Sequence, residues 1–240
     1  MVRTIFAFMF LVFSVIFLSL TGLPLNLICF LLGLWKFRPH LNRWIAQTWG
    51  RSLILVTGCK MTVAGIENIP NKGGVCFASN HGSIFDIGLI LAYAGRPLGF
   101  IAKKELMFVP LLNIWIPVLG GLYIDRKNFR KGLKTINKGV SRIKAGGAIV
   151  IFPEGRRSRG QGLLPFHSGS LKLATQALAP IIPVAISGSY DVFEKSKRVC
   201  PGPVNVTFCP PVYTADLSSA DRKHLVPAQV YEAISEALSR

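Results

Sequence analysis

Short apolar runs of three to six residues recur after residue 60, and stretches with helical spacing of apolar positions separate several of them. This alternation is typical of an α/β fold with a largely buried sheet. We therefore predict an α/β domain over residues 59–240. The expected strands are Met61–Ala64, Val75–Ala78, Leu122–Ile124, Ala148–Phe152, Ile181–Ile186 and Val204–Phe208.

One expected strand contains prolines, with Pro180 before it and Pro183 in its middle. Proline cannot donate a ladder hydrogen bond, so it is found mainly in edge strands. We therefore expect this strand at an edge or rim of the sheet.

Two amphipathic helices are expected, at residues 127–144 and at residues 226–239. The polar face of the first carries seven basic residues and no acidic one. Such a face is usually only solvated, but the missing acids favour binding of an anion. Lipid headgroups or an acidic carrier protein would fit.

The N-terminal part has a different pattern, because no charged residue occurs between Thr4 and Trp35. Such a run predicts a membrane-embedded segment, and turn-forming residues at 21–26 interrupt it. Either residues 5–23 cross the bilayer once, or two short arms form a hairpin at Gly22–Asn26. Basic residues flank both ends, Arg3 on one side and Lys36 on the other. The hairpin is therefore favoured, with both ends and the α/β domain on the cytoplasmic face of the cell membrane.

Basic residues and tryptophans alternate after this run, and no acidic residue occurs before Glu67. This mixture is typical of a helix in the headgroup layer, although an ordinary amphipathic helix packed on the domain has the same pattern. We assign residues 1–58 to a membrane anchor with an interfacial helix.

Composition supports a membrane surface as the partner. Among 240 residues 50% are hydrophobic, and the net charge is +17. Nucleic acid is the other common partner of basic chains, but no nucleic-acid module is recognisable. The five cysteines have no zinc-type spacing, and no phosphate-binding glycine loop is present. We expect no metal, no cofactor and no nucleic acid.

Candidate chemistry lies in Asn80-His81-Gly-Ser-Ile-Phe-Asp86, between an apolar strand and a helix-like stretch. His81 and Asp86 are five residues apart, so they can touch only if the chain turns irregularly, as Gly82 and Ser83 permit. A carboxylate would orient the imidazole and leave its other nitrogen free to accept a proton. Alternatively, Ser83 and Asp86 form only a helix-capping box.

A second cluster follows the strand that ends near Phe152, in the sequence Pro-Glu154-Gly155-Arg-Arg157-Ser-Arg. Arginine is the planar cation that grips phosphate oxygens. A phosphate site is one interpretation of this loop, and a basic surface loop is the other.

Together these blocks resemble the glycerolipid acyltransferase superfamily, most closely the 1-acyl-sn-glycerol-3-phosphate acyltransferases. The resemblance covers about residues 60–190, with four blocks in the family's order. The blocks are Asn80-His81-x4-Asp86, then Lys103-x-x-Leu106 with Ile124-Asp125-Arg126, then Phe152-Pro153-Glu154-Gly155 with Arg157-Ser158, and lastly Ile182-Pro183-Val184. The chain departs from the family pattern at Asn113, Arg156 and His167.

The resemblance implies a mixed central sheet flanked by helices, and an acyl transfer to lysophosphatidic acid. His81, held by Asp86, would be the general base. The donor would be an acyl-acyl-carrier-protein or an acyl-coenzyme A. No G-x-S-x-G nucleophile elbow is present, so direct transfer is expected. The residues implied to bind substrate are Lys103, Arg126 and Arg157 at the phosphate, and Glu154 and Gly155 at the acceptor pocket.

Other functions remain open on the sequence. The same fold could acylate glycerol-3-phosphate, another lysophospholipid or a lyso-amino-acid lipid. A non-catalytic basic lipid-binding protein is a different class. An esterase is disfavoured by the missing nucleophile.

Overall fold

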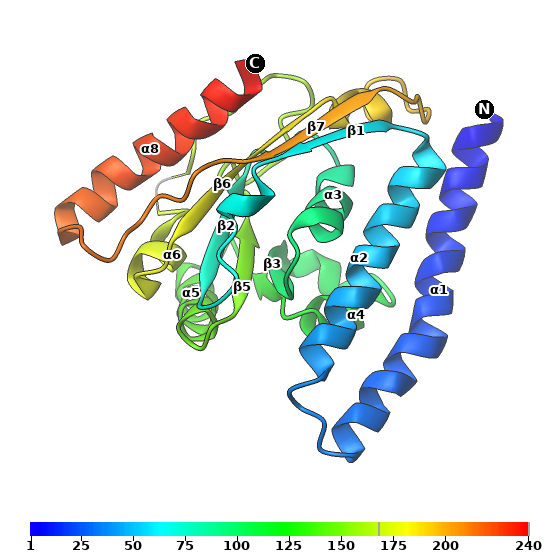
Figure 1. The fold of residues 1–240 in the computed structure, drawn as a ribbon, viewed down its shortest axis with the longest axis horizontal. Coiled ribbons are helices and arrows are strands. Elements are labelled where there is room, and N and C mark those ends of the chain that lie inside the picture. Colours follow the sequence, from blue (N-terminus) through cyan, green and yellow to red (C-terminus); the bar gives the residue numbers. More distant parts are fainter. Residues whose placement is uncertain (168, 240) are drawn as a thin grey trace.

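The computed structural model describes residues 1–167 and 169–239, and its centre is a twisted sheet with helices on both faces (Figure 1). The strands are β1 Lys60–Ala64, β2 Val75–Ser79, β3 Leu98–Lys103, β4 Leu122–Ile124, β5 Ala148–Ile151, β6 Ile181–Ser187 and β7 Pro203–Phe208. The helices are α1 Val2–Leu31, α2 Arg38–Thr57, α3 Phe85–Tyr93, α4 Leu112–Val118, α5 Phe129–Lys144, α6 Lys172–Ala177, α7 Ser189–Val192 and α8 Ser219–Ser239, with short 3-10 helices at Ile66–Asn68 and Lys104–Phe108.

In the described part of the chain, the sheet has seven strands in the order β1-β7-β6-β2-β5-β3-β4. All neighbours are parallel except β6 and β7. The predicted α/β class with a mixed sheet is therefore confirmed. Alternate side chains of β2 face opposite layers: Val75 and Phe77 pack toward α2 and α3, whereas Cys76 and Ala78 pack toward α5, α6 and α8. This two-sided burial explains why the central strands are apolar throughout.

Strand β3 was absent from the sequence prediction. It contains Gly99, and glycine inside a strand weakens the sequence signal. The glycine is needed because a Cβ atom at Gly99 would lie 2.1 Å from the carbonyl oxygen of Gly120. The backbone approaches too closely there for any side chain.

The edge position predicted for the proline-containing strand is wrong, because β6 lies inside the sheet between β7 and β2. Its pairing with β7 begins at Val184, opposite Phe208. The carbonyl of Pro183 accepts from the N–H of Cys209, 2.9 Å away, just beyond the end of β7. Pro183 is paired with Ala78 in the ladder with β2, and its missing N–H is on the side of β7, where the strand register begins only at Val184.

The turn predicted at Gly22–Asn26 is also wrong, because α1 runs unbroken from Val2 to Leu31. The polar residues expected to turn the chain bond within the helix instead, Asn26 Nδ2 donating to the Gly22 carbonyl at 2.9 Å. Gly22 makes room for the Trp115 ring, which a Cβ would approach to 2.9 Å. The chain reverses later, between residues 32 and 37, so that α1 and α2 lie antiparallel (Figure 1).

One side of α1 packs against the rest of the protein. The large apolar side chains of the helix lie on its other sides and are exposed. The packed side is made of small or polar residues that let neighbouring helices approach. Its members are Ala7, Ser14, Ser19, Gly22, Asn26 and Cys29. Among the described residues, α1 is the helix long and apolar enough to cross a membrane.

Candidate active site

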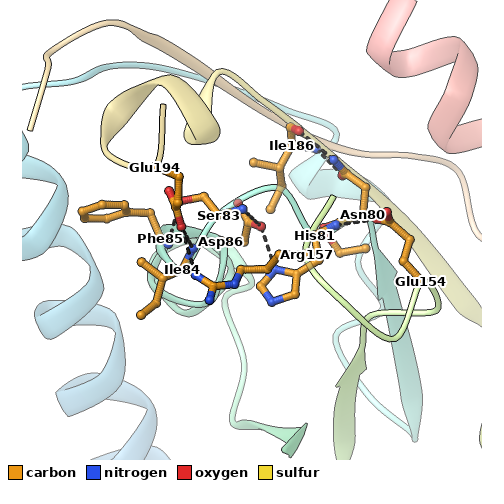
Figure 2. A network of polar contacts seen from close by, with 11 residues as sticks. Asn80, His81, Ser83, Ile84, Phe85, Asp86, Glu154, Arg157, Ile186 and Glu194 are labelled. Atoms are coloured by element: carbon orange, nitrogen blue, oxygen red, sulfur yellow. Dashed lines mark hydrogen bonds and ion pairs between the residues drawn. The ribbon is translucent and has the colours of Figure 1, made fainter. Parts of the chain in front are cut away.

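The chain turns sharply between β2 and α3, and this turn joins His81 to Asp86 (Figure 2). The distance from His81 Nδ1 to Asp86 Oδ2 is 2.8 Å, so the predicted contact across five residues is confirmed. The same oxygen accepts from the N–H of Ser83 at 2.9 Å, as in a helix cap. One fully buried carboxylate therefore bonds both the imidazole and the backbone just before α3. The capping box is incomplete, because the Ser83 hydroxyl accepts from the Phe85 N–H at 3.1 Å and not from the Asp86 N–H.

The His81 ring is held on its face as well as at its edge. It stacks on Phe152 with 4.0 Å between ring centroids. Its side chain is 16% exposed, and its Nε2 atom has no hydrogen-bond partner among the described residues. With Nδ1 bonded to a carboxylate, Nε2 is the atom available to accept a proton.

Glu154, in the loop after β5, is hydrogen-bonded to this turn. It is 2% exposed, and it accepts from the His81 N–H at 2.7 Å and from the Leu164 N–H at 3.0 Å. The His81 carbonyl in turn accepts from the Ser158 N–H at 2.7 Å. Burial is the main cause that raises the pKa of Glu154, and the two backbone hydrogen bonds oppose it. The loop after β5 therefore holds the backbone of His81 on both sides.

Asn80 joins the turn to β6. Its amide nitrogen donates to the Ile186 carbonyl at 2.8 Å, and its amide oxygen accepts from the Ile186 N–H at 2.8 Å. These paired bonds imitate one step of a sheet ladder where β2 ends. The side chain fixes the point at which the turn that carries His81 leaves the sheet.

Glu194, just after α7, was not predicted from the sequence. This carboxylate is 8% exposed and accepts from the Ser83 hydroxyl and the Ile84 N–H, each at 2.7 Å. Arg157 Nη1 lies 3.2 Å from it (Figure 2). More than 100 residues separate Glu194 from the turn, and no local pattern marks such a contact.

The expected phosphate-binding residues lie at the ends of neighbouring strands and their loops. Arg126 donates to the Gly155 carbonyl, which brings the second and third blocks together. Gly155 has φ +68°, and a Cβ there would meet the His167 ring at 2.4 Å. The Lys103 side chain is 58% exposed, and its Nζ atom lies 3.5 Å from Glu105 Oε1.

Lys104 forms an ion pair that the sequence did not predict, with its Nζ 2.8 Å from Asp125 Oδ2. This hydrogen bond is the main cause that raises the pKa of Lys104 and lowers that of Asp125. The pair fixes the start of the loop that leads to Arg126. In the described residues, no group of three or more His, Cys, Asp or Glu could hold a metal ion.

The raised pKa of Glu154 generates a prediction about stability. The folded protein binds more protons than the unfolded chain between the ordinary pKa of 4.5 and the raised value. Stability from this residue is therefore present at low pH and is lost as the pH rises through that window. The Glu154→Gln variant lacks this titration. We expect the stability of the wild type relative to the variant to fall as the pH rises.

Thermal unfolding of both proteins in one detergent, between about pH 4 and pH 7, measures this difference. Other carboxylates titrate in both proteins and cancel in the comparison. A difference that stays constant with pH, or increases, would contradict the assignment.

The family model described as Acyltransferase matches residues 60–187. The chain is 33% identical to a 1-acyl-sn-glycerol-3-phosphate acyltransferase of Cocos nucifera over 223 residues, which are 88% of this chain and 69% of the relative. It is 34% identical to a protein of that name from Salmonella typhimurium over 156 residues, 65% of this chain and 63% of the relative.

A solved structure has the same fold. The 1-acyl-sn-glycerophosphate (LPA) acyltransferase PlsC from Thermotoga maritima matches with a TM-score of 0.80 and 24% identity, over 99% of this chain and 95% of that chain. The family model spans more than half of the 240 residues, and the Cocos nucifera relative is matched over more than two thirds of its length. The chain therefore belongs to the acyltransferase family of enzymes.

Proposed function

We propose that this enzyme transfers a fatty acyl group from an acyl thioester to the sn-2 hydroxyl of 1-acyl-sn-glycerol-3-phosphate, giving phosphatidic acid. The observation that carries the proposal is the His81 imidazole, bonded to buried Asp86 through Nδ1 and free at Nε2. The names of the relatives support the same acceptor.

His81 Nε2 takes the proton of the sn-2 hydroxyl as the hydroxyl oxygen attacks the thioester carbonyl carbon. Asp86 stabilises the imidazolium that forms, because the carboxylate lies 2.8 Å from Nδ1. When the tetrahedral intermediate collapses, the C–S bond breaks and the imidazolium returns the proton to the leaving thiolate. No acyl-enzyme is needed.

The negative charge on the intermediate needs a hydrogen-bond donor. In the turn, the N–H groups of His81, Ser83 and Ile84 already donate to Glu154, Asp86 and Glu194. Gly82 is buried, and its N–H has no partner among the described residues. The Gly82 N–H is therefore our candidate for the oxyanion donor.

Lys103, Arg126 and Arg157 bind the phosphate of the acceptor in this mechanism. Arg126 is fixed by the carbonyl of Gly155, and Arg157 by Glu194. A guanidinium fixed at one nitrogen still presents other N–H donors to an anion. Glu154 is buried against backbone, so it shapes the acceptor pocket by holding His81 rather than by touching substrate.

The donor is an acyl-carrier protein or coenzyme A carrying the acyl group, and both are anionic. The basic face of α5 is the surface that suits either one. Its exposed cations have no acidic residue on the same helix to neutralise them.

The exposed apolar face of α1 supports a membrane location. Thr4 Oγ1 near one end accepts from the Val199 N–H at 2.9 Å, and Ser19 Oγ further along accepts from Trp115 Nε1 at 2.9 Å. A helix attached to the domain along its length cannot cross a bilayer without carrying charged α2 into it. We therefore place the α1–α2 hairpin in one leaflet, on the cytoplasmic face of the membrane.

Loss of the base is the first test. We expect His81→Ala to lower turnover by at least about 10²-fold, because a positioned general base contributes that much or more. The assay follows radiolabelled acyl donor and lysophosphatidic acid with purified enzyme. His224→Ala, an exposed histidine on α8, is the matched control. Full activity in His81→Ala would favour the non-catalytic lipid-binding alternative.

The Glu194→Ala variant tests whether Glu194 positions the turn that carries His81. Glu194→Ala removes one acceptor for three buried or half-buried donors. We expect kcat to fall by roughly 10²-fold with a smaller change in KM, because a small displacement of the base disturbs the reacting geometry. Exposed Glu232→Gln on α8 is the control. If kcat is unchanged while the Tm falls, Glu194 is only structural.

The phosphate-binding assignment predicts acceptor selectivity. Replacing lysophosphatidic acid with 1-acylglycerol removes two or more charge-assisted hydrogen bonds, so kcat/KM should fall by roughly 10²-fold. Arg157→Ala should lower the ratio of kcat/KM for lysophosphatidic acid to kcat/KM for 1-acylglycerol. The control variant at exposed Arg156, Arg156→Ala, should leave this ratio unchanged. Equal rates on both acceptors would contradict the assignment and point to another lipid acceptor.

A further inference from the structure

The segment between β3 and β4 has no charged residue from Leu106 to Ile124, yet several of its large apolar side chains face outward. We call residues 107–114 the apolar knuckle. Met107 is 50% exposed, Phe108 84%, Val109 38% and Ile114 42%. A cluster of exposed apolar residues of this kind marks a site of interaction.

Helix α4 attaches the apolar knuckle to the N-terminal hairpin. Trp115 is 8% exposed and donates from Nε1 to Ser19 Oγ, 2.9 Å away. The Val118 carbonyl accepts from Asn42 Nδ2 at 3.1 Å, and Asn42 also accepts from Asn26 at 2.8 Å. Helix α4, whose first turn is the end of the apolar knuckle, therefore packs against α1 and α2.

Because α4 is attached to α1, the depth of α1 in a bilayer also determines the depth of the apolar knuckle. Next to the contact residues Ser19 and Asn26, α1 carries exposed apolar side chains, among them Leu20 at 72% and Leu27 at 57%. If this face lies in the bilayer, α4 and the residues before it lie at the same level. On this basis, which rests on the membrane placement proposed above, we infer that the apolar knuckle inserts into the bilayer as a second contact beside the α1–α2 hairpin.

The backbone of the apolar knuckle suits the interfacial region rather than the hydrocarbon core. Some of its backbone groups bond within the segment, the Val109 N–H to the Leu106 carbonyl at 3.2 Å and the Asn113 N–H to the Val109 carbonyl at 3.1 Å. Irregular backbone is not tolerated in contact with the hydrocarbon core. The side chains of Met107 and Phe108 therefore reach the acyl chains while the backbone stays among the headgroups.

Charges at the base of the segment fit this depth. Lys103 and Lys104 precede it, and Asp125 and Arg126 follow it. The 2.8 Å bond to Asp125 raises the pKa of Lys104, which therefore stays cationic at neutral pH. Insertion would place these cations at the level of lipid phosphates. A lysophospholipid could then offer its phosphate to the site while its acyl chain remains in the bilayer.

Depth-dependent fluorescence tests the insertion independently of activity. A label is attached through Phe108→Cys in the full chain, with accessible Cys59 and Cys200 changed to serine. The protein is placed in phosphatidylcholine–phosphatidylglycerol vesicles that contain a doxyl-labelled phospholipid quencher. Leu31→Cys, at an exposed position on α1, is the positive control. Tyr213→Cys, at a 66% exposed position, is the negative control, because the segment between β7 and α8 lies away from α1 and α2 (Figure 1).

We expect the label at position 108 to be quenched as strongly as that at position 31, and the label at position 213 not to be quenched. Quenching at position 31 but not at 108 would overturn the inference. Cross-linking of position 108 to a second copy in place of quenching would also overturn it. Quenching at 108 in an enzyme that fails the His81 test would leave the insertion standing and the catalytic proposal refuted.

Kinetics give a second readout. Phe108→Ser should fold normally, because the side chain is 84% exposed. With lysophosphatidic acid in vesicles, we expect KM to rise about ten-fold, the change that corresponds to losing roughly 1.4 kcal/mol of side-chain burial, while kcat is kept. With a short-chain soluble acceptor, KM should not change. An equal rise with both acceptors, or no rise with either, would overturn the inference.

Discussion

The active site depends on keeping an irregular turn rigid at the end of β2. Four residues, from His81 to Ile84, leave the regular hydrogen bonding of both strand and helix, and most of them are buried or half-buried. Buried backbone groups usually find partners, and three of the four N–H groups in this turn donate to carboxylates, the Gly82 N–H being the exception. Asp86 supplies one from within the turn, and Glu154 and Glu194 supply the others from distant parts of the chain. Together the three carboxylates bond the imidazole and the backbone on either side of it.

This arrangement explains which features the sequence could predict. The contact between His81 and Asp86 is local, so the residue spacing and the glycine between them were enough to predict it. The central strands are buried on both faces, so their apolar runs were recognisable. The amphipathic pattern of α5 was equally clear, and its observed start at Phe129 differs by two residues from the prediction.

The errors have one physical cause, which is close contact between segments far apart in sequence. Gly22 was interpreted as a turn residue, but it leaves space for the Trp115 ring. Gly99 concealed a strand because the Gly120 backbone occupies the place of its side chain. Pro183 suggested an edge because the sequence does not reveal that β7 ends opposite it. Glu194 carried no local signal at all. In each case the residue type is explained by a contact with a segment that is distant in sequence and becomes a neighbour only in the folded chain.

The same long-range contacts link the membrane segment to the chemistry. Phe8 on α1 packs edge-on against Phe193, with 5.2 Å between ring centroids. The next residue is Glu194, which bonds to the turn that carries His81. Further along the helix, Trp115 ties α1 to the segment that leads to Asp125 and Arg126. A change in the depth of α1 would therefore reach both His81 and the loop that carries Arg126. In the proposed mechanism the acceptor is a lipid, so this arrangement would hold the imidazole at a constant height relative to the acceptor hydroxyl.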